Sequence, residues 1–186
     1  MVGVITLVRR LLIIFILVIL LFKADDIGKH FYPFPYRETI SQQAVANNID
    51  PFFMAAVIKT ESGFDPNAKS PAGAMGLLQI MPDTGKWVAE QMGQKEFTAN
   101  NLYNPETSIK MGAWYLANLK QEFKGDQTLV LAAYNAGRGN VKQWLENQHW
   151  TGDEKTIDQI PFPETRNYIR KVMVNYKVYN FLYDGT

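Results

Sequence analysis

Cysteine is absent from the 186-residue sequence, and its two histidines, His30 and His149, lie far apart. Without cysteine there is no disulfide framework, so the hydrophobic core alone must stabilise the fold. Two distant histidines are too few to build a zinc site, and no glycine-rich phosphate loop follows an expected strand. The sequence therefore predicts no metal and no other cofactor.

A strong charge of either sign is also lacking, because the formal net charge is +1. Three of the 19 basic residues, Arg9, Arg10 and Lys23, flank an apolar stretch in residues 1–23, a segment without any acidic residue. The rest of the chain has 16 basic and 18 acidic residues, a net charge of about −2. Nucleic-acid binding requires a concentrated basic face, so we expect no nucleic acid as a partner.

The long apolar run extends from Leu11 to Phe22, directly after the two arginines. Such a run is typical of an export or membrane-anchoring segment. It is shorter than the ~20 residues that cross a bilayer comfortably, which leaves a cleaved signal peptide as an alternative. However, the bulky Phe22 and the charged Lys23 fit a cleavage site poorly. We therefore predict an N-terminal transmembrane helix within residues 1–23, with the arginines in the cytosol and the remaining chain outside.

The rest of the chain divides into a connector over residues 24–37, rich in proline and aromatic residues, and one domain over residues 38–186. In this domain, capping residues or prolines precede apolar patterns, and glycines follow them. The pattern predicts helices that begin near residues 51, 82, 105, 127, 141 and 163. Residues 65–80 are rich in Pro, Gly, Ala and Ser and should form a loop or short hairpin. The expected fold class is therefore mainly α.

Glu61 occupies an unusual place in the helix expected after Pro51. Met54, Val57 and Ile58 precede it at helical spacing, which places its carboxyl on the apolar face. Partial burial and the negative end of the helix dipole both disfavour the carboxylate, so we predict a raised pKa. An acid that stays protonated near neutral pH can protonate a glycosidic oxygen. The pattern alone, however, favours a plainer alternative, an acid at the helix rim that bends out to water.

Four sequence blocks begin at this glutamate and follow in the order Glu61–Phe64, Ser70–Pro82, Ala133–Gly137 and Glu164–Tyr168. Together they resemble the soluble lytic transglycosylase family, over roughly residues 40–182. The resemblance implies a lysozyme-like fold, mainly α, with a small β-element beside the cleft in residues 65–80. It also implies cleavage of the β-1,4 bond between N-acetylmuramic acid and N-acetylglucosamine in peptidoglycan without water, which leaves a 1,6-anhydro end.

The resemblance assigns roles to particular residues. It implies that Glu61 is the single catalytic acid and base, and that the matching cleft positions bind the sugars. These substrate-binding positions are Ser62, Ser70, Gln79, Met81, Tyr134, Asn135, Glu164 and Tyr168. For Ser62, a structural role at the end of the helix is an equally open alternative, and Glu164 is interpreted as an organising residue rather than a second catalytic acid.

The residues support a one-acid mechanism independently. Most glycosidases use two carboxylates, but substrate-assisted enzymes are exceptions. Asp65, the nearest rival of Glu61, precedes a proline and is more simply a turn residue. For each tryptophan, core packing is favoured over sugar stacking. These tryptophans are Trp87, Trp114, Trp144 and Trp150.

Two alternative functions stay open at this point. The same acid on the same fold could hydrolyse the glycan as a lysozyme does, or the domain could bind the cell wall without cleaving it. The expected partners are peptidoglycan strands and the membrane, and the protein is expected to be a monomer. Its domain should lie on the outer side of the cell membrane, facing the cell wall or the periplasm.

Overall fold

The computed structural model describes residues 9–10, 15 and 23–184. The helix predicted within residues 1–23 falls almost entirely outside these residues, so the anchor stays a prediction. Within the described part of the chain, no helix is both long enough and apolar enough to span a membrane.

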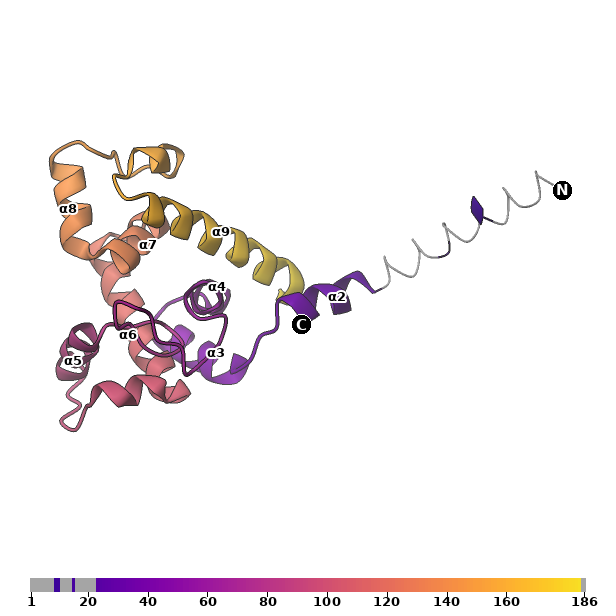
Figure 1. The fold of residues 1–186 in the computed structure, drawn as a ribbon, viewed down its shortest axis with the longest axis horizontal. Helices are drawn as coiled ribbons and strands as arrows, with labels where there is room; N and C mark the ends of the chain where they lie inside the picture. Colours follow the sequence, from indigo (N-terminus) through magenta and orange to yellow (C-terminus); the bar gives the residue numbers. More distant parts are fainter. Residues whose placement is uncertain (1–8, 11–14, 16–22, 185–186) are drawn as a thin grey trace.

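The described residues form a mainly helical structure, as the capping pattern predicted (Figure 1). In chain order the α-helices are α2 (Ala24–Phe31), α3 (Arg37–Ala46), α4 (Pro51–Glu61), α5 (Pro82–Gln91), α6 (Pro105–Glu122), α7 (Gln127–Ala136), α8 (Arg138–Glu146) and α9 (Pro163–Tyr183). Two 3-10 helices, η1 (Ala99–Tyr103) and η2 (Glu154–Gln159), lie between them.

The helix starts follow local capping chemistry. A proline occupies the start of α4, α5, α6 and α9, where the missing N–H costs nothing. The Asp50 and Asp126 side chains accept hydrogen bonds from the first free backbone amides of α4 and α7. The sequence analysis did not identify α3, because its polar sequence contributes only Ile40 and Ala44 to the core.

Helix α4 lies at the centre of the fold and packs mainly against α9, with α3 on another side (Figure 1). Its six consecutive residues 53–58 are all buried. A helix that is apolar all round is expected to be enclosed by its neighbours. The core therefore holds the C-terminal end of α4, and with it Glu61, in a fixed position.

Residues 65–80 follow α4 and contain the small β-element expected there. It consists of two isolated antiparallel bridges, between Lys69 and Met75 and between Met75 and Ile80. Gly76 has a φ of +73° in this segment, and a Cβ at this position would collide with the backbone carbonyl of Leu102. Because only glycine fits, the loop can lie directly against η1.

The connector was expected over residues 24–37. Its residues 24–36 pack against the C-terminal end of α9, and Arg37 begins α3. Gly28 of α2 contacts the Leu182 side chain. The Tyr179 hydroxyl donates a hydrogen bond to the Pro33 carbonyl over 2.9 Å, and the Tyr183 hydroxyl donates one to the Tyr32 carbonyl over 2.8 Å. The connector is thus tied to the domain by specific contacts.

Candidate active site

A cleft of about 680 Å³ lies where the end of α4, the 65–81 segment, the end of α7 and the first half of α9 meet. It brings together residues that are up to 111 positions apart in the chain. The cleft is lined by Thr60, Glu61, Ser70, Ala72, Ala74, Gln79, Met81, Tyr134, Asn135, Glu164, Asn167, Tyr168 and Lys171. Eight of the nine residues that the sequence analysis singled out are among them, the exception being Ser62.

Glu61 carries the most perturbed carboxyl of this cleft. Its pKa is raised from 4.5 to about 7, mainly because burial disfavours the charged form. The nearby negative charge of Glu164 raises the pKa further, whereas Tyr168 lowers it. The upward shift predicted from the sequence is confirmed. Burial is its main cause, as the sequence suggested, and the charge of Glu164 is a further cause that the sequence analysis did not name.

The Tyr168 hydroxyl is buried beside Glu61. It has no hydrogen-bond partner of ordinary distance and angle among the described residues. It is nevertheless close enough to lower the pKa of the Glu61 carboxyl, and burial raises the pKa of Tyr168 itself well above that of free tyrosine. The hydroxyl therefore stays protonated and is available to donate to a carboxylate at Glu61.

Gln79 has an unusual backbone conformation, with a φ of +44°. Strain of this kind is tolerated where the surrounding structure holds a residue in place, and it is frequent at functional sites. The side-chain amide donates to the Ala68 carbonyl over 3.1 Å and to the Gly76 carbonyl over 2.9 Å. Both donors are used, so the amide oxygen remains as an acceptor, suited to the N–H of an acetamido group.

Ser70 and Met81 contribute different surfaces to the same wall. The Ser70 hydroxyl oxygen accepts a hydrogen bond from the Ala74 amide over 3.0 Å, which leaves its proton available as a donor. The Met81 side chain is 42% exposed although it is apolar. An exposed thioether beside polar groups fits the apolar face of a sugar ring.

Tyr134 and Asn135 lie at the end of α7, as predicted. The Tyr134 hydroxyl donates to the Leu78 carbonyl over 2.7 Å and so links α7 to the 65–81 segment. The Asn135 amide oxygen accepts from the buried Thr165 hydroxyl over 2.7 Å. This bond orients the Asn135 amide group and leaves its N–H donors without a partner in the described part of the chain.

Ser62 does not line the cleft. Its hydroxyl donates to the Leu77 carbonyl over 2.8 Å and accepts from the Phe64 amide over 3.1 Å. These contacts join the end of α4 to the following segment, and they fit the structural alternative that the sequence left open.

Three polar cleft residues were missed by the sequence analysis, namely Thr60, Asn167 and Lys171. Asn167 and Lys171 share one face of α9 with Glu164 and Tyr168, since the four residues stand at i, i+3, i+4 and i+7. Helical spacing from Glu164 would therefore have identified two of the three.

The four tryptophans lie outside the residues that line the cleft. Trp144 and Trp150 are buried, and Trp87 packs edge-to-face on Trp114 with ring centroids 5.5 Å apart. Their packing agrees with the core role that the sequence analysis favoured.

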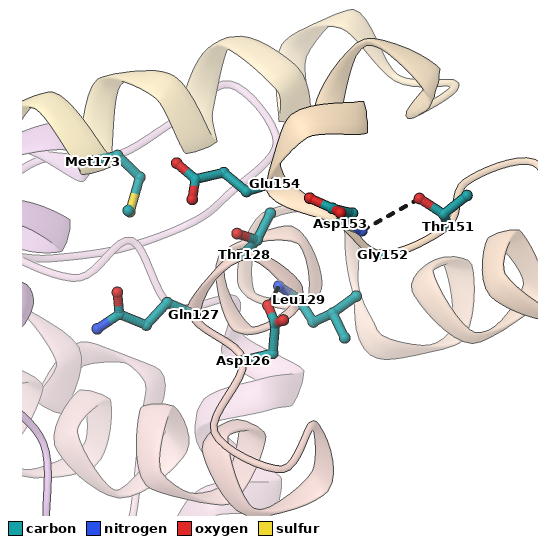
Figure 2. Close-up of a pocket in the computed structure, with 9 residues that line it drawn as sticks. All are labelled: Asp126, Gln127, Thr128, Leu129, Thr151, Gly152, Asp153, Glu154 and Met173. Carbon is teal, nitrogen blue, oxygen red and sulfur yellow. Dashed lines mark hydrogen bonds between the residues drawn. The ribbon is translucent and has the colours of Figure 1, made fainter.

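A separate hollow of about 580 Å³ lies at the start of α7 and contains none of the predicted site residues (Figure 2). Two of its acids serve as caps, because Asp126 accepts from the Leu129 amide and Asp153 from the Lys155 amide. In the described residues, no group of three or more His, Cys, Asp or Glu side chains is arranged to hold a metal ion. Helix capping explains Asp126 and Asp153, and Glu154 lies in the first turn of η2, so the site of interest remains the Glu61 cleft.

Comparison with known proteins gives consistent results. The family model described as "Transglycosylase SLT domain" matches residues 38–157. The soluble lytic murein transglycosylase of Salmonella typhimurium is 34% identical over 144 residues, which cover 76% of this chain and 22% of that protein. The endo-type membrane-bound lytic murein transglycosylase A of Salmonella paratyphi B is 32% identical over 155 residues, which cover 72% of this chain and 76% of that protein.

The fold agrees with a crystal structure as well. The 70 kDa soluble lytic transglycosylase of Escherichia coli superimposes with a TM-score of 0.75 at 31% identity, covering 83% of this chain and 25% of that one. The chain thus spans about a quarter of the length of the soluble relatives. The mainly α, lysozyme-like fold expected from the sequence is shared with this structure. On the family match and these relatives together, the chain belongs to the transglycosylase SLT domain family.

Proposed function

We propose that this protein is a peptidoglycan lytic transglycosylase that cleaves the β-1,4 bond between N-acetylmuramic acid and N-acetylglucosamine. The observation that carries the proposal is the Glu61 carboxyl, which has a pKa of about 7 within a cleft lined by polar side chains. About half of such carboxyls carry a proton at pH 7, so the group can act as acid and as base. The names of the relatives in the same family support the same reaction.

The proposed reaction has two proton transfers through Glu61. The protonated carboxyl first donates to the glycosidic oxygen as the bond from the muramyl anomeric carbon breaks. The resulting carboxylate then takes the proton of the muramyl 6-hydroxyl, whose oxygen bonds to the same carbon and closes the 1,6-anhydro ring. Water is not consumed, and Glu61 ends protonated.

The surrounding side chains suit these steps. The Tyr168 hydroxyl beside Glu61 can donate to the transient carboxylate and stabilise it. The free acceptor of Gln79 and the free donors of Asn135 suit the acetamido groups of the two sugars. An acetamido group held beside the anomeric carbon can stabilise positive charge there, as in other substrate-assisted enzymes.

Hydrolysis by a lysozyme-type mechanism is the second candidate. It is favoured by Glu164, an exposed second carboxyl that lines the same cleft and is close enough to raise the pKa of Glu61. A second carboxylate could activate water on the opposite face of the sugar ring. The two reactions differ in their products, because anhydro ends are lighter than reducing ends by one water.

The test is mass analysis of the products from purified peptidoglycan, for the wild type and for Glu61→Gln. We expect anhydro-muropeptides from the wild type, with activity that falls as the pH rises through about 7 because the acid form of Glu61 is lost. The Glu61→Gln protein should fold and release at least about 1,000-fold less product. Reducing ends from the wild type would indicate hydrolysis, and near-normal release by folded Glu61→Gln would refute the role of Glu61.

We also propose that the protein acts as a monomer on the outer side of the cell membrane, anchored by residues 1–23. The apolar run Leu11–Phe22 after two arginines supports this orientation. The contacts between residues 24–36 and α9 would then keep the domain close to the membrane. Fractionation of cells, followed by protease treatment of the exposed side, tests the location.

A further inference from the structure

A second hollow adjoins the Glu61 cleft on the side of α9. It has a volume of about 460 Å³ and is lined by Lys59, Thr60, Arg170, Lys171, Val174 and Asn175. Thr60 and Lys171 also line the Glu61 cleft, so the two hollows adjoin at these two residues. A ligand in the cleft can therefore extend a branch into this hollow, called the basic groove below.

The lining of the basic groove includes three cations and no acid. The Lys59 ammonium donates to the Phe31 carbonyl over 3.3 Å and lies 5.5 Å from the centre of the Tyr32 ring. Arg170 forms an ion pair with the exposed Asp158 over 2.6 Å. Lys171 forms no ion pair or hydrogen bond in the described part of the chain, which leaves its charge unbalanced at the junction with the cleft.

Two of these cations have partners in the structure. Lys59 at the end of α4 contacts the Phe31 carbonyl, and Arg170 on α9 pairs with Asp158, both at exposed positions. Two other lining residues are bonded to each other, since the Asn175 amide donates to the Thr60 hydroxyl over 2.9 Å. The groove is thus a shaped basic surface, and it is best suited to a carboxylate.

The glycan strand of the proposed substrate offers no such group, because its sugars are uncharged within the chain. The carboxylates of peptidoglycan belong to the peptide stems, and each stem branches from the lactyl group of a muramyl residue. A muramyl residue bound in the Glu61 cleft would carry its stem on the sugar whose neighbouring hollow is this groove, since the two share Thr60 and Lys171. We infer that the basic groove binds a carboxylate of this peptide stem, with Lys171 as the principal contact.

This inference rests on the proposed function and is tested with two matched substrates. Both are uncrosslinked glycan strands with acetylated stem amino groups, and in one of them the stem carboxylates are converted to methylamides. The measurement is kcat/KM for the release of muropeptides from each substrate by the wild type, Lys171→Gln and Lys59→Gln. Lys177→Gln serves as the control, because Lys177 is an exposed lysine on the same helix outside both hollows.

The wild type should prefer the free carboxylates by about two- to fivefold, the effect expected of a solvent-accessible charge pair. Lys171→Gln should bring the ratio of the two kcat/KM values close to one, mainly through KM for the carboxylate substrate. Lys59→Gln should lower the ratio partly, and Lys177→Gln should leave it unchanged. Added salt at about 0.5 M should reduce the wild-type ratio, because it screens exposed charges.

Two results would overturn the inference while leaving the proposed function intact. In the first, the wild type cleaves both substrates equally well. In the second, Lys171→Gln lowers both kcat/KM values by the same factor, which would mean that the lysine supports the cleft and not the stem. Absence of any cleavage by folded wild-type protein would instead refute the proposed function itself, and the inference with it.

Discussion

Burial of the Glu61 carboxyl has opposite consequences for chemistry and for stability. The same desolvation that keeps the acid protonated near neutral pH makes its ionised form unfavourable in the folded state. In the unfolded chain the pKa returns to about 4.5, so the folded state binds more protons than the unfolded state between pH 4.5 and 7. The free energy of unfolding therefore decreases as the pH rises through this window.

The Glu61→Gln substitution should reveal how much the buried carboxylate lowers the free energy of unfolding. Glutamine cannot ionise, so the variant and the wild type should have similar stability near pH 4.5. Above about pH 7.5 the variant should be more stable by up to about 3 kcal/mol, the equivalent of a shift from 4.5 to about 7. Urea denaturation of both proteins at the two pH values measures the difference. A stability difference that does not change with pH would contradict the raised pKa.

Properties of single residues could be predicted from the sequence only where the spacing of neighbouring residues indicates them. The position of Glu61 on an apolar helical face follows from Met54, Val57 and Ile58, so its burial and pKa direction could be inferred. The left-handed backbone of Gln79 could not, because no local pattern requires it.

At the scale of elements, the 65–81 segment determines the shape of the cleft. It supplies three of the residues that the sequence analysis assigned to the site, Ser70, Gln79 and Met81, yet it has only two β-bridges of its own. Its order comes from contacts with other elements, namely the bonds from Ser62 and Tyr134 to its carbonyls and the close approach of Gly76 to Leu102. Damage to one of these contacts should therefore affect both stability and the cleft.

Gly76→Ala tests this dependence, with Gly73→Ala as a matched control. Both glycines have positive φ, but a Cβ at Gly73 meets open space whereas one at Gly76 meets the Leu102 carbonyl. We expect Gly73→Ala to cost about 1 kcal/mol from backbone strain alone and Gly76→Ala about 3 kcal/mol or more. Thermal and urea unfolding measure the two losses of stability. Equal losses would show that the close approach of Gly76 to Leu102 adds no further cost.

At the scale of the whole molecule, α9 connects the three parts that the function requires. Residues between 164 and 175 line the cleft and the basic groove, Asn175 also bonds to Thr60 of α4, and the last turns hold residues 24–36. Phe34 adds to the last contact, because its ring packs on those of Tyr179 and Tyr183 with centroids 5.5 and 5.4 Å apart. The segment that leads to the predicted anchor is therefore coupled to the domain through α9, and Lys59 of α4 adds a further contact to the Phe31 carbonyl.

Tyr179→Phe should loosen this coupling without opening the core. The substitution removes the hydrogen bond to the Pro33 carbonyl but keeps the ring, so a loss of about 1 kcal/mol is expected. Hydrogen exchange should become about fivefold faster in α2 and stay unchanged in α4. Tyr176→Phe is the control, because Tyr176 lies on the same helix as Tyr179 but bonds to Asp50, the cap of α4. Loss of that bond should leave hydrogen exchange in α2 unchanged. If both variants speed hydrogen exchange in α2 equally, the hydrogen bond from Tyr179 to Pro33 does not specifically hold this segment.

The sequence by itself determined the helical fold class, the helix starts at proline and capping residues, and the place of Glu61 on an apolar helix face. These follow from interactions within a few residues along the chain, which the printed sequence displays directly. It did not reveal α3, whose buried face comprises only Ile40 and Ala44, or the way residues 24–36 pack.

The tertiary structure alone decided what surrounds Glu61. The cleft joins segments separated by as many as 111 positions. Thr165 orients the Asn135 amide and Ala68 and Gly76 orient that of Gln79, which leaves the Asn135 N–H groups and the Gln79 oxygen without a partner among the described residues. Ser62 matches the family pattern yet bonds to the Leu77 carbonyl instead of lining the cleft. Local chemistry sets where helices begin and which face is apolar, but packing sets which polar atoms remain unsatisfied, and those atoms are the ones available to a substrate.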